Sequence, residues 1–262
     1  MKLFSIFGNP VSHSISPKMH NLALEGLKIN GCYTRTPLVD GGDLIKKFHA
    51  LKLDGANVTV PHKESAFSLC DGVDSFAQSI GAVNTLVKKN GLVYGYNTDA
   101  PGFYEAIKEF GNISNALVLG AGGTAKAIAT VLNQKGITPT ILNRSRDRLD
   151  YFYTHGFDAF SWDNFKINSY DLIINTTSAG LIDESLPLDT HILNALMKKS
   201  KFAFDVIYNK NTPFLKQARE NSLVCKDGTD MLLYQGVLAF NLFFNNTLNS
   251  KKITQLMRGA FN

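Results

Sequence analysis

The sequence has 262 residues, of which 44% are hydrophobic, with a formal net charge of +5 and three cysteines. Domains usually hold about 100–200 residues, so this length predicts two of them. No run approaches the roughly 20 apolar residues of a membrane helix, and the basic residues are scattered, which argues against a membrane protein and a nucleic-acid-binding protein. The odd cysteine count without a C-x-x-C pair favours reduced thiols. The apolar run at the start is too short for a secretion signal, so a cytoplasmic location is expected.

The first hundred residues alternate short β-type runs with helical runs. Strands are predicted at residues 3–7, 32–38 and 56–60, and helices at 16–27 and 43–51. Asn90-Gly91 lies between two further β-type runs and is a strong hairpin signal. This βαβ alternation predicts a largely parallel sheet covered by helices.

The second half repeats the alternation in an order typical of a Rossmann-type dinucleotide fold. Strands are predicted at 115–119, 138–142, 171–175 and 202–206, and helices at 101–110, 123–134, 146–153, 213–219, 231–244 and 253–261. We therefore expect an α/β protein with an open α/β substrate domain at residues 1–100 plus about 237–262, to which the last helices return. A Rossmann-type dinucleotide-binding domain is expected at residues 101–236.

The segment Gly120-Ala121-Gly122-Gly123-Thr124-Ala125 matches the G-x-G-x-x-G/A pattern directly after a predicted strand and at the start of a predicted helix. The first glycine permits the tight turn, and the second lets the backbone approach a pyrophosphate. The free amides at the helix start hold the charge of that pyrophosphate. A glycine turn that serves close packing alone is the alternative interpretation.

The end of the next strand indicates which dinucleotide is bound. An NAD site places an acidic residue about 20 residues after the glycine loop, but here the sequence reads Asn143-Arg144-Ser145-Arg146. A guanidinium group binds a 2′-phosphate through charge-assisted hydrogen bonds, so NADP is favoured over NAD. For Arg146 and Arg148 an exposed helix face is at least as good an interpretation.

Polar patches follow the predicted strand ends of the first domain. They are residues 12–16, 57–63, 84–85 and 97–99. In an open parallel sheet, ligands bind beyond the carboxyl ends of the strands, so we expect one pocket. Its hydroxyl and amide groups suit a substrate rich in hydroxyl groups.

Reduction of a ketone requires a proton donor at the new alkoxide, and Lys63 with Asp99 are the candidate catalytic pair. Which of the two carries the proton is left open, because the titration of such a pair is shared. A surface lysine and a helix-capping aspartate are the alternative. The six histidines show no metal-ligand spacing, so no metal is expected.

These motifs, in this order, resemble those of the shikimate dehydrogenase family over nearly the whole chain. The matching stretches are residues 8–17, 57–63, 81–85, 97–99, 120–125, 143–145, 174–180, 227–228, Met231 and Gln235. The resemblance implies the reversible NADPH-dependent reduction of 3-dehydroshikimate to shikimate in aromatic amino-acid biosynthesis.

The resemblance also implies individual roles. Substrate-binding residues would be Ser14, Ser16, Thr59, Asn84 and Gln235, with Lys63 and Asp99 as the reactive pair. The nicotinamide side would be lined by Thr176, Thr177, Ser178, Val206, Gly228 and Met231. Tyr208 either bonds the substrate or only forms a wall of the cleft.

Two alternatives stay open: a quinate/shikimate dehydrogenase that uses NAD or NADP, and a non-catalytic NADP-binding sensor. The chain also departs from the family, which commonly has Tyr-x-Pro where this sequence reads Tyr208-Asn209-Lys210, so a stiff turn is missing there. The expected partners are small molecules. The patterns do not fix the oligomeric state, and a homodimer is one option.

Overall fold

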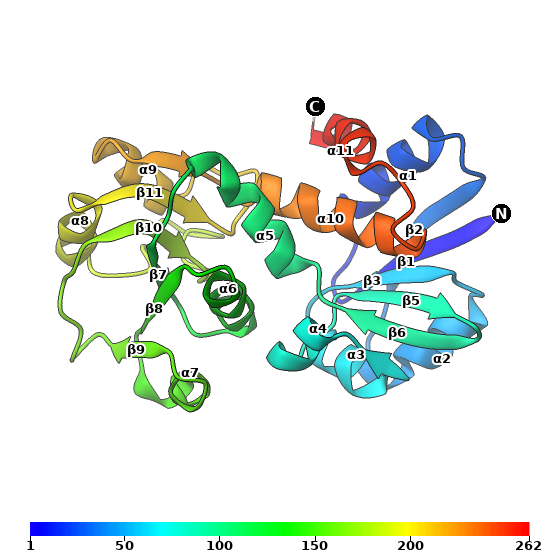
Figure 1. Ribbon diagram of the computed structural model, residues 1–262, viewed down its shortest axis with the longest axis horizontal. Coiled ribbons are helices and arrows are strands. Elements are labelled where there is room, and N and C mark those ends of the chain that lie inside the picture. The colour runs from blue at the N-terminus through cyan, green and yellow to red at the C-terminus, as the bar shows by residue number, and fades with distance from the viewer. Residues whose placement is uncertain (262) are drawn as a thin grey trace. The chain divides into compact units, whose positions relative to one another are not determined.

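The computed structural model describes residues 1–261 (Figure 1). The chain forms two compact units: unit 1 contains residues 1–102 and those from 233 onward, and unit 2 contains residues 103–232. The chain passes between the units within helices α5 (Asp99–Ile107) and α10 (Thr229–Phe243). The domain boundaries expected from the sequence fall within the same two helices. Among the described residues, no helix has both the length and the apolar character needed to cross a bilayer.

Unit 1 is built on a six-stranded sheet with the strand order β2-β1-β3-β5-β6-β4. Its strands are β1 (Lys2–Gly8), β2 (Gly31–Pro37), β3 (Gly55–Val58), β4 (Gly72–Val73), β5 (Thr85–Lys89) and β6 (Leu92–Tyr96). β1 pairs in parallel with β2 and β3, whereas β5 pairs antiparallel with both β3 and β6. Asn90 and Gly91 have positive φ angles and form the expected hairpin turn between β5 and β6.

Helices cover this sheet, and two of them come from the C-terminal part of the chain. They are α1 (Ser16–Gly26), α2 (Leu44–Ala50), α3 (Lys63–Leu69), α4 (Ser75–Ile80), the second part of α10, and α11 (Ser250–Arg258). A Cβ atom at Gly26 would lie 2.3 Å from Leu256, so α1 and α11 pack closely. The Phe4 ring stacks on Phe243 at 4.8 Å. The C-terminal helices therefore belong to the core of unit 1.

Unit 2 contains a fully parallel sheet with the strand order β12-β11-β10-β7-β8-β9. Its strands are β7 (Asn115–Leu119), β8 (Thr138–Asn143), β9 (Asp158–Ser161), β10 (Tyr170–Asn175), β11 (Ser200–Asp205) and β12 (Val224–Lys226). When these strands are numbered 1 to 6 in chain order and the sheet is read from β9 to β12, the order is 3-2-1-4-5-6. This is the order of a doubly wound dinucleotide fold, so the Rossmann-type prediction is confirmed.

The main helices of unit 2 follow the predicted positions with two exceptions. They are α6 (Gly123–Gln134), α7 (Asp150–Thr154), α8 (Thr190–Met197) and α9 (Pro213–Glu220). The helix expected at 146–153 was too long, because the chain first makes a 3-10 turn at Arg146–Arg148 and α7 begins only at Asp150. The short elements β9, β12 and α8 were not predicted.

Candidate functional site

Lys63 and Asp99 form an ion pair in unit 1. Nζ of Lys63 lies 2.6 Å from Oδ2 of Asp99, and the side chains are 30% and 21% exposed. Each residue is the first of a helix, Lys63 of α3 and Asp99 of α5. The alternative of a capping aspartate does not describe this geometry, because Oδ1 of Asn97 accepts from the amides of Asp99 and Ala100 at 3.1 and 3.5 Å. The carboxylate of Asp99 is thereby left for the lysine.

Asn84 is buried at 3% exposure and held by a hydrogen-bond network. Its Oδ1 accepts from the amide of Thr98 at 2.8 Å and from the hydroxyl of Thr85 at 2.9 Å, while its Nδ2 donates to Oγ1 of Thr98 at 3.1 Å. Behind it, the hydroxyl of Tyr33 donates to Oδ1 of Asn57 at 2.8 Å, and Nδ2 of Asn57 donates to Thr85 at 3.0 Å. A backbone N–H can only donate, so the orientation of the Asn84 amide is fixed.

Ser14 lies in the loop between β1 and α1, and Ser16 is the first residue of α1. Their hydroxyl oxygens are 3.2 Å apart, and the Ser16 amide also donates to the Ser14 hydroxyl at 3.3 Å. Ser16 is buried and Ser14 is half-buried. The two hydroxyls therefore form one compact hydrogen-bonding group.

Close approaches at two glycines position Thr59 and Gln235. A Cβ atom at Gly8 would lie 2.4 Å from Cγ2 of Thr59, so the glycine at the end of β1 is what lets Thr59 lie there. A Cβ atom at Gly102 would lie 2.6 Å from the backbone nitrogen of Gln235, so α5 and the middle of α10 approach closely within unit 1. Gln235 is buried.

All the predicted substrate residues except Tyr208 thus belong to unit 1. Tyr208 is an exposed residue of unit 2, in the segment that follows β11. Among the described residues, no group of histidine, cysteine, aspartate and glutamate side chains has a metal-binding arrangement.

The glycines in the glycine loop of unit 2, residues 120–125, are of two kinds. Gly120 has φ +109°, and a Cβ atom there would lie 2.7 Å from Oγ1 of Thr176, so the fold itself requires this glycine. At Gly122 and Gly123 a Cβ atom would meet nothing within 4 Å, and both are exposed. Close packing explains Gly120 but not the other two, which leave room for a ligand to approach the backbone.

The start of α6 suits a pyrophosphate. Gly122 is its N-cap, no side chain caps its first amides, and its first turn contains no acidic residue. Ala121 and Ala125 are buried, whereas Thr124 is half-buried. The free amides of a twelve-residue helix therefore face outward beside the two open glycines.

Arg144 follows the end of β8, next to Asn143, whose Nδ2 donates to the carbonyl of Ser145 at 2.9 Å. Arg144 is exposed, and within residues 1–261 its guanidinium has no hydrogen bond or ion pair. Arg146 and Arg148 are also exposed, in the 3-10 turn. These residues fit a dinucleotide that carries an additional phosphate group.

The segment after β10 is tied to the glycine loop. Oγ1 of Thr176 donates to the carbonyl of Leu119 at 2.7 Å. Oδ1 of the buried Asn175 accepts from the amide and the hydroxyl of Thr177 at 3.0 and 2.7 Å, and Ser178 is exposed. Thr176 and Thr177 are therefore ordered by the ends of β7 and β10.

Gly228 brings the start of α10 close to the end of β11. A Cβ atom at Gly228 would lie 2.2 Å from the carbonyl oxygen of Val206, so no larger residue is accommodated without a shift. The Gly228 amide donates to the carbonyl of Ile207 at 3.0 Å. Met231, in the first turn of α10, is half-buried.

Comparisons with known proteins identify the family of this chain. The profile of the "Shikimate dehydrogenase substrate binding domain" matches residues 6–86. A protein of Helicobacter hepaticus named shikimate dehydrogenase (NADP(+)) is 49% identical over 249 residues, which cover 94% of this chain and 92% of that protein. The chain belongs to the shikimate dehydrogenase family.

Solved structures share the fold over the whole length. Shikimate 5-dehydrogenase of Thermus thermophilus, solved in complex with NADP(H) and shikimate, superimposes with a TM-score of 0.88 at 35% identity and covers 99% of this chain and 100% of its own. A 5-ketofructose reductase of a Gluconobacter strain superimposes with a TM-score of 0.84 at 28% identity, with 98% of both chains covered. The fold of shikimate dehydrogenases therefore also occurs in a protein named for another ketone.

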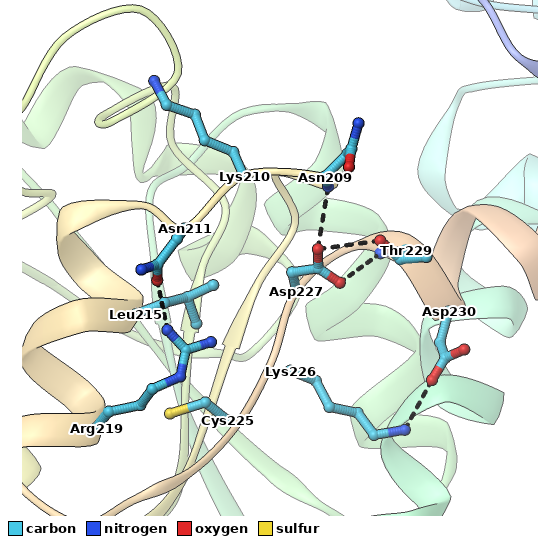
Figure 2. Close-up of a pocket in the computed structure, with 10 residues that line it drawn as sticks. All are labelled: Asn209, Lys210, Asn211, Leu215, Arg219, Cys225, Lys226, Asp227, Thr229 and Asp230. Atoms are coloured by element: carbon cyan, nitrogen blue, oxygen red, sulfur yellow. Dashed lines mark hydrogen bonds and ion pairs between the residues drawn. The ribbon is translucent and has the colours of Figure 1, made fainter. Parts of the chain in front are cut away.

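The family's usual Tyr-x-Pro turn is replaced here by a hydrogen-bonded turn. The amide of Asn209, whose φ is +56°, donates to Oδ2 of Asp227 at 3.0 Å, and the same carboxylate accepts from the amide and hydroxyl of Thr229. These residues line a cavity of about 530 Å³. Figure 2 shows their side chains. There Lys226 is paired with Glu109 at 2.6 Å and Asp230 at 2.9 Å. The charged side chains around this cavity therefore bond to groups of the chain itself, and we assign the cavity no ligand.

Sequence reasoning missed Asp205 in this member of the shikimate dehydrogenase family. Its carboxylate is fully buried and accepts from Nδ2 of Asn175 at 3.2 Å, the amide of Ile207 at 3.1 Å and the hydroxyl of Thr212 at 2.6 Å. Burial raises the pKa of this carboxyl despite the three hydrogen bonds, which oppose the rise. Asp205 holds both ends of the segment that carries Tyr208. An aspartate closing an apolar strand was the only signal available in the sequence.

Proposed function

We propose that this chain catalyses the reversible NADPH-dependent reduction of 3-dehydroshikimate to shikimate, in the pathway to the aromatic amino acids. The observation that carries the proposal is the Lys63–Asp99 ion pair at 2.6 Å in a unit that also positions amide and hydroxyl groups suited to a polyhydroxylated ring. The names of its relatives support it: one is a shikimate dehydrogenase (NADP(+)), and another was solved with NADP(H) and shikimate.

Unit 1 supplies the proposed substrate contacts. Ser14, Ser16 and Thr59 offer hydroxyl groups for the carboxylate end of the ring, and the Asn84 amide has one N–H left after its bond to Thr98. Gln235 completes the proposed set, and Tyr208 from unit 2 is proposed as a further contact. A buried amide or hydroxyl that loses its partner is costly, so these groups discriminate against ring acids that lack the matching hydroxyl.

Unit 2 supplies the proposed NADP contacts. The backbone of residues 120–125 would hold the pyrophosphate, and Asn143, Arg144 and Ser145 the 2′-phosphate end. Thr176, Thr177, Ser178, Val206, Gly228 and Met231 would border the nicotinamide. When bound, the reduced nicotinamide supplies the hydride for the ketone carbon.

The Lys63–Asp99 pair acts as the general acid in the reduction and as the general base in the oxidation. In the reduction, the ketone oxygen gains negative charge, and the pair donates one proton to it, which leaves a hydroxyl group. In the oxidation the pair removes that proton. Nζ of Lys63 donates one hydrogen bond to Asp99 and has further hydrogen-bonding capacity for the substrate oxygen.

A steady-state assay of the purified protein tests the proposal. Shikimate with NADP is expected to produce absorbance at the reduced nicotinamide band, and quinate or NAD is expected to do so much more slowly. Comparable turnover of quinate, or with NAD, would instead identify a quinate/shikimate dehydrogenase. NADP binding without turnover of either acid would favour the sensor. 5-Ketofructose with NADPH serves as a further arm, because a protein of this fold is named for that ketone.

Two further properties are part of the proposal. The three cysteines are all free thiols, which supports a cytoplasmic location. A homodimer is the proposed assembly, and light scattering of the purified protein measures it.

A further inference from the structure

We infer that Arg35 is a positioning residue for substrate specificity. Its guanidinium lies beside the serine loop, which carries the hydroxyls of Ser14 and Ser16. The positive charge of this guanidinium makes the two hydroxyls select a ring that bears a carboxylate. The inference rests on the proposed function and extends it. Nothing in the sequence pattern singled out Arg35, which occupies an exposed position in β2.

The geometry places the charge of Arg35 at the serine loop. Its Nε and Nη2 both donate to the carbonyl oxygen of Ser14, at 3.0 and 2.7 Å. Two bonds from one planar group to one oxygen fix the guanidinium in place. The register brings this about, because Arg35 pairs with Ile6 near the end of β1, and the serine loop follows β1.

The charge of Arg35 is not neutralised within the chain. In the part of the chain that the structure describes, no carboxylate forms an ion pair with this guanidinium. Its Nε and Nη2 both donate to a neutral carbonyl oxygen. The positive charge therefore remains available to an anion bound at the neighbouring hydroxyls.

The distance is short enough to matter for an anion. The carbonyl oxygen and Oγ of one serine lie within about 5 Å, so the guanidinium lies within about 8 Å of the Ser14 hydroxyl. This is about one Debye length at physiological salt, and a unit charge pair at that distance in a partly aqueous site changes affinity by about three- to tenfold. Ser14 and Ser16 are themselves neutral, so their hydroxyls can also bond the oxygens of an ester or amide, and a positive charge nearby adds to the preference for a carboxylate.

The experiment compares shikimate with its methyl ester, which lacks the negative charge. We expect Arg35→Gln to lower kcat/KM for shikimate by about three- to tenfold, mainly through KM, and to leave kcat/KM for the ester within about twofold. Arg35→Lys keeps the charge and is expected to retain most of the preference for the acid. Lys88→Gln removes a charge from an exposed position of β5 in the same unit and serves as the matched control, with no change expected.

Equal losses for acid and ester in Arg35→Gln would overturn the inference, because Arg35 would then act only by supporting the loop. No change for either substrate would overturn it too, and so would an equal effect of Lys88→Gln. Equilibrium binding of the acid and the ester to the same variants repeats the comparison without turnover. Absence of turnover by the unmodified protein would count against the proposed function, but the ratio of acid binding to ester binding would still test Arg35. Failure of shikimate to bind at all would overturn both.

Discussion

The backbone amide of Thr98 donates to the carboxamide oxygen of Asn84, 2.8 Å away, and so fixes the positions of the oxygen and the nitrogen of that side chain. Asn84→Asp keeps the accepting oxygen but replaces the donor with an anionic oxygen. We expect the KM for shikimate to rise by about tenfold or more. The KM for NADP is the internal control and should not change, and an unchanged shikimate KM would remove Asn84 from the substrate contacts.

The Lys63–Asp99 pair is expected to control turnover. Lys63→Ala and Asp99→Asn should each lower kcat by about 10²- to 10⁴-fold, because each removes one half of the proton-transfer group. Lys2 and Asp54 form a second pair in unit 1, at 2.7 Å, so Lys2→Ala is a matched control for the loss of a lysine–aspartate contact. Near-normal turnover by either dyad variant would exclude that residue from the reaction.

Arg144 is expected to distinguish the two nicotinamide dinucleotides. Arg144→Ala removes a charged hydrogen-bond donor to the 2′-phosphate, so the KM for NADP should rise by about 10- to 100-fold and the KM for NAD far less. Arg146→Ala, from the exposed 3-10 turn, is the comparison variant. Equal effects of Arg144→Ala on both dinucleotides would count against the phosphate contact.

The two kinds of glycine in the nucleotide loop should respond differently to alanine. Gly122→Ala places a methyl group where the chain has no neighbour within 4 Å, so the free energy of unfolding should stay within about 0.5 kcal/mol while the KM for NADP rises. Gly120→Ala combines a positive φ with a 2.7 Å approach to Thr176 and should destabilise unit 2 by about 1–3 kcal/mol. Denaturation and kinetics of both variants test this contrast, which normal NADP binding by Gly122→Ala would contradict.

His20 should make unit 1 sensitive to acid. It is fully buried, stacks on Tyr33 at 4.2 Å, and burial lowers its pKa from 6.5 to about 3. Between these values the folded protein binds fewer protons than the unfolded chain, so stability is lost as the pH falls. From pH 7.5 to 5 this loss is about 2 kcal/mol.

Hydrogen exchange of the α1 amides in urea at both pH values measures this loss. His20→Phe should lack it, and His191→Gln, at an exposed position, should retain it. The same acid sensitivity in His20→Phe would assign the effect to another group.

Local signals predicted the elements around the site well. α6 begins at Gly123 and ends at Gln134 as expected, because its glycine start and apolar face are encoded within the helix itself. The hairpin at Asn90-Gly91 is a similar case. By contrast, α3, α4 and β4 are short and depend on packing against the sheet for their stability, which no local pattern expresses.

Long-range contacts were harder to predict. The sequence pointed to both Lys63 and Asp99 but left Asp99 open as a helix cap, and only the structure shows that Asn97 takes that role. Arg35 and Ser14 are brought together by the register of β1 and β2, and Asp205 by the ends of two parallel strands. Such contacts depend on topology, so single residues gave no sign of them.

The close approach of Gly102 to Gln235 has a consequence for synthesis of the chain on the ribosome. Unit 2 is one continuous stretch and can complete its sheet as soon as residue 232 has emerged, whereas unit 1 must wait for its last helices. The N-terminal strands are therefore made first but finished last, and until α10 and α11 arrive the apolar faces of Phe4 and α1 lack their cover. Early release or C-terminal truncation should thus harm the half of the molecule that is translated first.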